Sequence, residues 1–104
     1  MDFKKYNSIR TLMFVSQPRD KESESLIYVG NSLAGEVGEI CNVIKKIFRD
    51  NDGVPTEKQT YQLMDEIGDT FWYICHMMMI AGINPEQVFD KNIDKLKKRY
   101  DNEQ

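Results

Sequence analysis

The sequence has few of the features that mark secreted, membrane-spanning or nucleic-acid-binding proteins. Its two cysteines, Cys41 and Cys75, lie far apart in apolar segments, so we expect reduced core thiols of a cytoplasmic protein rather than a disulfide framework. The net charge of -3 gives no broad basic surface, which argues against nucleic acid as a partner. The N-terminus lacks the apolar run of a signal peptide, and the longest apolar stretch, residues 71–81, is too short to span a membrane.

Internal repeats, low-complexity segments and a glycine-rich phosphate loop are also missing. What remains is ordinary for a folded, soluble protein, because 40% of the residues are hydrophobic and 30% are charged. A length of 104 residues predicts one domain, residues 1–104, with a modest hydrophobic core.

Helical periodicity begins near the N-terminus. We expect a first helix over residues 3–16, with apolar positions at Phe3, Tyr6, Ile9, Leu12, Met13 and Val15. Residues 17–19 end it, because Pro18 pushes the preceding residue out of the helical region. Residues 19–25 are charged and serine-rich, which predicts a loop, and Ser23 or Ser25 is expected to cap the next helix.

The second and third helices carry long apolar stripes. The second is predicted over residues 26–48, with a stripe at Leu26, Val29, Leu33, Val37, Ile40, Ile44 and Ile47. Residues 50–53 predict a solvated turn; they lack the ligand spacing and closing glutamate of a calcium loop. The third helix is predicted from Thr56 to residues 81–83, with a stripe at Leu63, Ile67, Phe71, Ile74 and Met78.

Residues 71–80 are apolar on almost every side of the predicted third helix. Such a helix must be covered on several sides, and four short helices in one chain can hardly do this, so we expect a homo-oligomer. The methionines in this run indicate a packing surface, because methionine fills irregular gaps. His76, the one histidine, has either a structural role or a contact near the functional site.

A fourth helix is predicted from Asn84 as its cap and Pro85 as its first residue. Its core-facing positions are expected at Phe89, Ile93, Leu96 and Tyr100. Beside them runs a polar stripe, Asn92, Lys95 and Arg99, which is either a solvated basic face or a set of side chains leaning over a groove. The predicted fold is therefore all-α, with four helices.

Two acidic pairs stand out on the predicted second and third helices. Glu36 and Glu39 are three residues apart, and Glu66 and Asp69 repeat this spacing, so each pair shares one helical face. A glycine precedes the second acid of each pair, at a cost of roughly 1 kcal/mol relative to alanine, which predicts a close backbone approach there. If the two helices pack together, four carboxylates converge and require a cation such as Mg²⁺ or retained protons.

Three interpretations of these acids are open. They hold Mg²⁺ against the phosphates of a nucleotide and activate a water, with Lys46, Lys95 and Arg99 as the phosphate clamp. They belong to a di-iron bundle, which requires Glu-x-x-His pairs that His76 does not form. Or they are solvated faces of a structural or regulatory helical dimer, which two glycine-spaced pairs beside apolar stripes do not favour.

Further motifs accompany the acidic pairs: Lys45-Lys46, the aromatic run 71–73, residues 82–85, and the spacing of Asn92, Lys95, Arg99 and Tyr100. In their order and spacing from about residue 33 to the C-terminus, these motifs resemble the MazG family of all-α nucleoside triphosphate pyrophosphohydrolases. The resemblance implies a four-helix bundle completed as a dimer or tetramer. It also implies cleavage of a (deoxy)nucleoside triphosphate to the monophosphate and pyrophosphate, for nucleotide-pool house-cleaning.

The resemblance also implies roles for single residues. Mg²⁺, or Mn²⁺, would be bound by Glu36, Glu39, Glu66 and Asp69, and one of the two glutamates of the first pair would activate the attacking water. Asn92, Lys95 and Arg99 match the phosphate-contacting pattern. Tyr73, seven residues after Glu66, either stacks on the base or is a core tyrosine.

The base pocket and the reaction have alternatives at this point. Phe14 and residues 17–19 are similar to the base pocket of dCTP-preferring members. The enzyme alternative is a phosphoribosyl-ATP pyrophosphohydrolase, which shares the fold and similar acids. The other is a non-catalytic helical module that binds a nucleotide or a protein.

Overall fold

The structure is a computed structural model that describes residues 1–16 and 24–103. The described part of the chain contains α1 (Phe3–Val15), α2 (Leu26–Asn51), α3 (Glu57–Ala81) and α4 (Pro85–Glu103), and no β-strand. The prediction of an all-α fold with four helices is confirmed for these residues. The predicted helix end at residues 17–19 and the alternative cap Ser23 lie outside them.

Each helix begins after a residue whose side-chain oxygen accepts a hydrogen bond from a backbone N–H of the first turn. These residues are Asp2, Ser25, Thr56 and Asn84. Thr56 also forms a capping box: the N–H of Gln59 donates to Thr56 Oγ1 (3.1 Å), and the N–H of Thr56 donates to Gln59 Oε1 (3.0 Å). The predicted starts at Ser25, Thr56 and Asn84 are therefore confirmed.

The two long helices end at residues with left-handed backbone. Gly82 (φ 69°) ends α3 where the sequence predicts it. In contrast, α2 runs to Asn51, three residues beyond the predicted end, and stops at Asp52 (φ 54°). The side-chain amide of Asn51 donates to Gln59 Oε1 (2.8 Å), so this last turn is tied to the start of α3.

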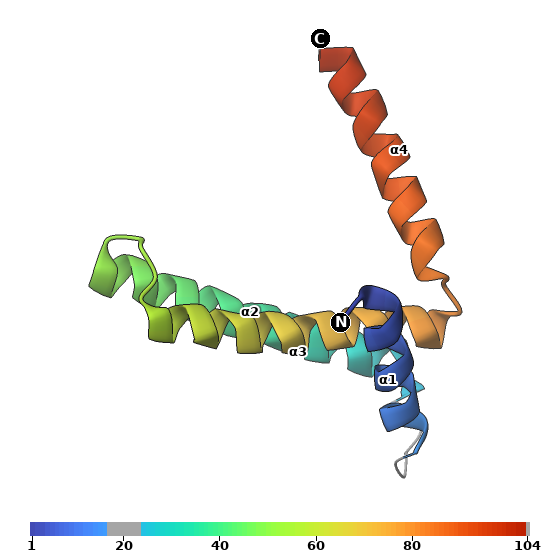
Figure 1. The fold of residues 1–104 in the computed structure, drawn as a ribbon, viewed down its shortest axis with the longest axis horizontal. Coiled ribbons are helices and arrows are strands. Elements are labelled where there is room, and N and C mark those ends of the chain that lie inside the picture. Colours follow the sequence, from blue (N-terminus) through green and yellow to red (C-terminus); the bar gives the residue numbers. More distant parts are fainter. Residues whose placement is uncertain (17–23, 104) are drawn as a thin grey trace.

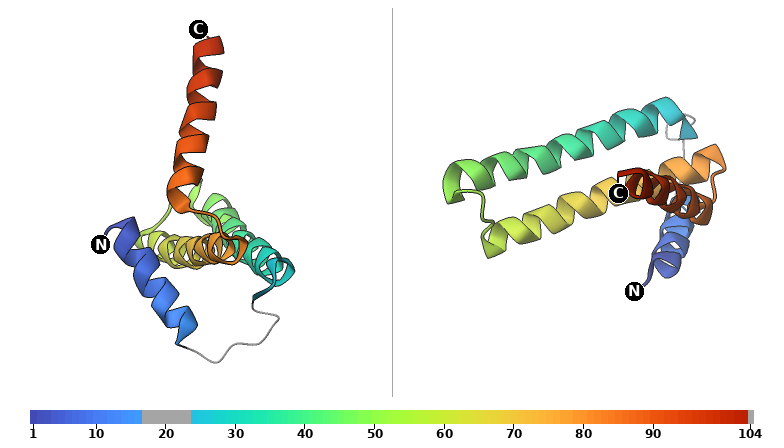
Figure 2. Two further views of the ribbon diagram at one scale, coloured as in Figure 1. Left: turned by 90° about the vertical axis from the view of Figure 1, so that its right-hand side faces the viewer. Right: turned by 90° about the horizontal axis from the view of Figure 1, so that it is seen from above.

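The helices α2 and α3 form an antiparallel hairpin that carries the rest of the fold. Figure 2 shows the two helices side by side, joined by the short turn after Asp52. α1 crosses the C-terminal half of α3, and α4 leaves the other helices at its first turns and projects away from them (Figure 1). The ring of Phe89 in α4 meets that of Phe3 in α1 at 5.4 Å, which holds the base of α4. The hairpin is therefore the only long helix pairing among the described residues.

The buried core is small. Among the described residues, the buried apolar side chains are Val29, Ile47, Cys75 and Met78. Cys75 is the buried thiol that the sequence predicts, but the prediction for Cys41 is wrong, because this residue lies on the exposed face of α2. Three of the four predicted core positions on α4 are also wrong within one chain: Phe89, Ile93 and Tyr100 are exposed because none of the described helices packs along α4, whereas Leu96 is half-buried.

The face that α1 buries matches the predicted one only in part. Phe3 and Tyr6, two of the predicted apolar positions, face α3 together with Arg10 and Phe14. The predicted positions Leu12, Met13 and Val15 are exposed. The rings of Phe3 and Tyr6 meet Phe71 at 5.8 and 5.6 Å, and the ring of Phe14 meets His76 at 4.2 Å. These contacts fix α1 across α3.

Arg10 and His76 form a buried polar contact between α1 and α3. Arg10 is only 1% exposed; its Nε donates to Asn7 Oδ1 (3.2 Å), its Nη1 lies 3.3 Å from His76 Nδ1, and its guanidinium lies 5.5 Å from the ring centre of Trp72. Because a guanidinium can only donate, Nδ1 of His76 accepts and the ring proton is on Nε2. Of the two roles open for His76, the structure supports the structural one.

Candidate functional site

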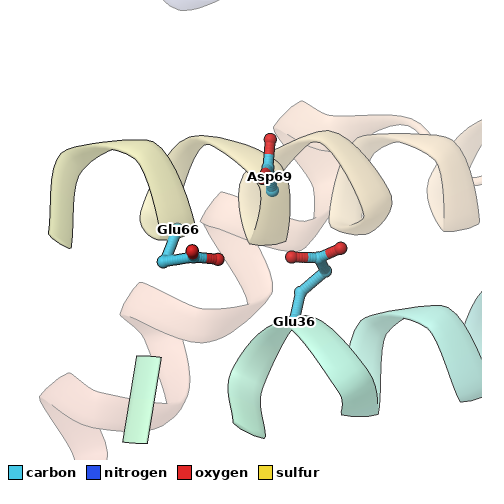
Figure 3. Close-up of side chains that lie close together, drawn as sticks. All are labelled: Glu36, Glu66 and Asp69. Carbon is cyan, nitrogen blue, oxygen red and sulfur yellow. The ribbon is translucent and has the colours of Figure 1, made fainter. Parts of the chain in front are cut away.

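Three carboxylates from the helical hairpin converge. Glu36 comes from α2, and Glu66 and Asp69 come from successive turns of α3; one carboxylate oxygen of each residue lies within 4.8 Å of those of the other two. In Figure 3 the side chains of Glu36 and Glu66 point toward each other across the two helices, with Asp69 beside them. Glu36 and Glu66 are half-buried and Asp69 is exposed. This group, which we call the acidic triad, is an arrangement that could hold a metal ion, and it contains three of the four carboxylates that the sequence predicts to converge.

The packing of α2 on α3 produces the acidic triad. The i, i+3 spacing puts Glu66 and Asp69 on one face of α3, and the antiparallel pairing brings Glu36 opposite them. The pKa of Glu66 is raised by burial and by the negative charges of Glu39 and Glu36, with smaller contributions from Asp69 and Asp65. All of the charged groups that act on Glu66 are acidic, so the described chain supplies no cation to balance this site.

Glu39 lies outside the acidic triad. It is exposed, one turn beyond Glu36 on α2, yet close enough for its charge to raise the pKa of Glu66. The sequence therefore places Glu39 in the right neighbourhood, but its carboxylate does not join the other three.

The described residues of one chain do not approach the backbone closely at these glycines, so the predicted close approach stays a prediction. A Cβ added at Gly35, Gly38 or Gly68 would have no atom of the described residues within 4 Å, apart from its own helix backbone and sequence neighbours. These glycines thus border open space beside the acidic triad.

None of the other predicted site residues is a member of the triad. Lys46 is exposed on α2, and its charge acts on Asp50, whose pKa is lowered chiefly by Arg49. Tyr73 is half-buried on α3, one turn beyond Asp69. The phosphate-binding candidates Asn92, Lys95 and Arg99 are exposed on α4, which projects away from the hairpin in Figure 1.

Sequence reasoning missed two titratable side chains of α1 that face α3. The pKa of Tyr6 is raised by burial, then by Cys75, with a smaller contribution from Asp69 of the triad. The pKa of Arg10 is lowered by burial. Phe3, Tyr6, Arg10 and Phe14 recur at helical spacing, and this was the available signal for the buried face of α1.

The family model of the MazG nucleotide pyrophosphohydrolase domain matches residues 24–103. The chain belongs to this family. The matched residues contain α2, α3 and α4, and hence the whole acidic triad and the polar stripe of α4. The family resemblance expected from the sequence motifs is thereby confirmed.

A protein of a bacterial virus is similar to most of the MazG chain. The Gene 37 protein of Mycobacterium phage L5 is 41% identical over 78 residues, which make up 75% of this chain and 68% of that protein. No solved structure matches the chain. None of the described helices has the length and apolar character needed to cross a membrane.

Proposed function

We propose that this protein hydrolyses (deoxy)nucleoside triphosphates between the α- and β-phosphates in a Mg²⁺-dependent reaction that releases the monophosphate and pyrophosphate. The observation that carries the proposal is the convergence of Glu36, Glu66 and Asp69 in a chain of the MazG nucleotide pyrophosphohydrolase family. Nucleotide-pool house-cleaning is the physiological role that we assign to this reaction.

The acidic triad fits a magnesium ion. Its three members offer only carboxylate oxygens, which are the ligands that Mg²⁺ prefers, and the ion commonly keeps water and substrate phosphate as further ligands. The pKa of Glu66 is raised by burial and then by repulsion from the neighbouring acids, and a divalent cation would relieve this repulsion. When bound, Mg²⁺ supplies positive charge that offsets the charge of the triphosphate. Mn²⁺ has similar ligand preferences and is expected to substitute.

Glu39 is the residue that we assign to proton transfer. It is exposed, free of the triad, and close enough to the triad to act electrostatically on Glu66. A carboxylate in this place accepts a proton from the water that attacks phosphorus, while Glu36, Glu66 and Asp69 hold the ion. Tyr73, half-buried on the same helix as Glu66, is the side chain that we assign to contact with the base.

The test is product analysis with a panel of canonical and modified nucleoside triphosphates, in Mg²⁺, Mn²⁺ and EDTA. The proposal predicts equal amounts of monophosphate and pyrophosphate from at least some of them, with no turnover in EDTA. Turnover of phosphoribosyl-ATP alone would overturn the substrate class. Nucleotide binding without turnover under every condition would contradict an enzyme and favour a binding module.

A further inference from the structure

A buried arginine and a buried histidine meet where α1 crosses α3, seven residues beyond Asp69 on α3. Arg10 is 1% and His76 is 4% exposed, and Nη1 of Arg10 lies 3.3 Å from Nδ1 of His76. A guanidinium keeps its proton and can only donate, so Nδ1 of His76 serves as a partner only while it carries no proton. The contact therefore depends on the charge of His76.

The other described partners of the guanidinium carry no negative charge. Its Nε donates to Asn7 Oδ1 at 3.2 Å, and its Nη2 donates to Thr11 Oγ1 at 3.4 Å and to Met79 Sδ at 3.7 Å. Neutral groups and the ring of Trp72, at 5.5 Å, thus surround a buried positive charge. A second positive charge on His76, 3.3 Å away, would repel a cation that these partners do not neutralise.

His76, the one histidine of the chain, is the group at this contact that titrates near neutral pH. From α1 the phenol of Tyr6 also faces this region, and from α3 the thiol of Cys75; burial raises the pKa of both, so both stay neutral below pH 8. On the side of α2, residues 26–35 contain no charged side chain, and Glu24, just before that helix, lines the cavity at the C-terminal end of α1. Between about pH 5 and 8, histidine is the ordinary side chain that changes charge.

The contacts that hold α1 on α3 fall into two groups. At the start of α1, the rings of Phe3 and Tyr6 meet Phe71 at 5.8 and 5.6 Å. Further along, the contacts centre on His76, which meets Arg10 and the ring of Phe14, the latter at 4.2 Å. The second half of α1 is therefore docked mainly on one titratable side chain.

We propose that the contact between Arg10 and His76 is a pH-sensitive switch: neutral His76 holds the C-terminal half of α1 on α3, and protonated His76 releases it. Protonation removes the acceptor of Arg10 and places two positive charges side by side. Since α1 is the described helix outside the family match to residues 24–103, the switch controls a segment attached to the family domain. It operates whether or not the protein hydrolyses nucleotides.

Hydrogen exchange of the wild-type protein between pH 8 and pH 5, with Mg²⁺ and without it, tests the proposal. After correction for the intrinsic effect of pH on exchange, the amides of residues 9–15 should lose protection by up to about tenfold per pH unit, because the released state binds one more proton. The α2–α3 hairpin should stay protected. A C-terminal half of α1 that keeps its protection at pH 5, or helices that all lose protection together, would overturn the proposal.

Two spectroscopic signals belong to single residues and locate the change. Trp72 is the one tryptophan and lies beside Arg10, so its emission should shift to longer wavelength when α1 is released. The imidazole signals of His76 are those of a single histidine, so titration by nuclear magnetic resonance reads its charge directly. Both midpoints should coincide with the loss of protection in α1. Release of α1 at a pH where the charge of His76 does not change would contradict the proposal.

His76→Asn separates the charge of residue 76 from its role as an acceptor. The amide oxygen of asparagine can accept from Arg10 in place of Nδ1, but it gains no proton in this range, so α1 should stay protected from pH 8 to pH 5. Glu66→Gln is the matched control, since it removes the carboxyl group of α3 whose pKa is raised, and α1 should still be released as in the wild type. Release of α1 in His76→Asn at the same pH as in the wild type, or loss of the pH-dependent release in Glu66→Gln, would overturn the proposal.

Discussion

Glu66 stands among like charges, and this decides how the site responds to pH. Its pKa is raised by burial and by the neighbouring carboxylates, first Glu39 and Glu36. The folded protein therefore holds a proton on Glu66 at pH values where the unfolded chain has already lost it. Without metal, this carboxylate makes the protein less stable as the pH rises through the interval from the ordinary glutamate pKa to the raised one.

The first prediction follows from this sign. In EDTA at neutral pH, Glu66→Gln should raise the melting temperature, because the substitution removes a charge that is repelled in the folded state. Below the ordinary glutamate pKa, residue 66 is uncharged in both proteins, so the difference should vanish. With saturating Mg²⁺ the order should reverse, because the wild type gains binding energy that the variant lacks. Thermal unfolding across pH measures all three. A melting temperature lowered by Glu66→Gln in EDTA at neutral pH would contradict the prediction.

Arg10 and Arg49 are expected to contribute very differently to the stability of the protein. Arg10 is buried and contacts Asn7, His76 and the ring of Trp72, whereas the ion pair of Arg49 with Asp50 is exposed. Arg10→Ala should lower the free energy of unfolding by about 2–4 kcal/mol, since it leaves a cavity and unpaired polar groups. Arg49→Ala should change it by less than about 1 kcal/mol. Denaturant unfolding of both variants provides the comparison, and equal effects would contradict the burial of Arg10.

At the scale of the helices, the boundaries could largely be predicted because caps are local. Thr56 with Gln59, and Asn84 with Pro85, carry their signal within four residues, and the structure has both. The end of α2 was harder to predict. Asp50 and Asn51 favour turns in isolation, but they remain helical here, where Asn51 bonds to Gln59 at the start of α3. This contact between helices outweighs the local preference for a turn.

The buried faces were harder to predict than the boundaries. Periodicity shows which face of a helix is apolar, but it does not show what covers that face, so Phe89 and Ile93 were expected in a core that a single chain does not build. Arg10 was missed because a buried arginine interrupts the apolar pattern that marks a buried face. Of the four carboxylates that were expected to converge, three do so. Glu39 does not join them, because an i, i+3 spacing fixes the face of a helix but not the direction of the side chain.

The helical glycines give a prediction at this scale. Apart from the backbone of its own helix, a methyl group at Gly30 or Gly68 would have no atom of the described residues within 4 Å. Gly30→Ala and Gly68→Ala should therefore each raise the free energy of unfolding by up to about 1 kcal/mol, through helix propensity alone. Denaturant unfolding measures both. If Gly68→Ala destabilises the protein while Gly30→Ala stabilises it, Gly68 does not border open space in solution.

At the scale of the whole molecule, the central claim is that the acidic triad makes this MazG protein a metal-dependent hydrolase. The sequence could predict the family and the convergence of the acids because both rest on short motifs, whereas no short motif indicates how α4 packs. The role of the triad can be tested by substitutions in a single chain, whatever its oligomeric state.

The most direct measurement is pyrophosphate release from a deoxynucleoside triphosphate, titrated with Mg²⁺, for the wild type, Glu66→Gln and Asp65→Asn. Asp65 is the matched control, since it is the acidic neighbour of Glu66 on α3 but lies outside the triad. We expect Mg²⁺-dependent release by the wild type and by Asp65→Asn. In Glu66→Gln we expect a loss of at least about 100-fold, more than the loss of an outer partner of a metal ligand typically costs. Wild-type turnover that persists in Glu66→Gln, with unchanged dependence on Mg²⁺, would contradict it.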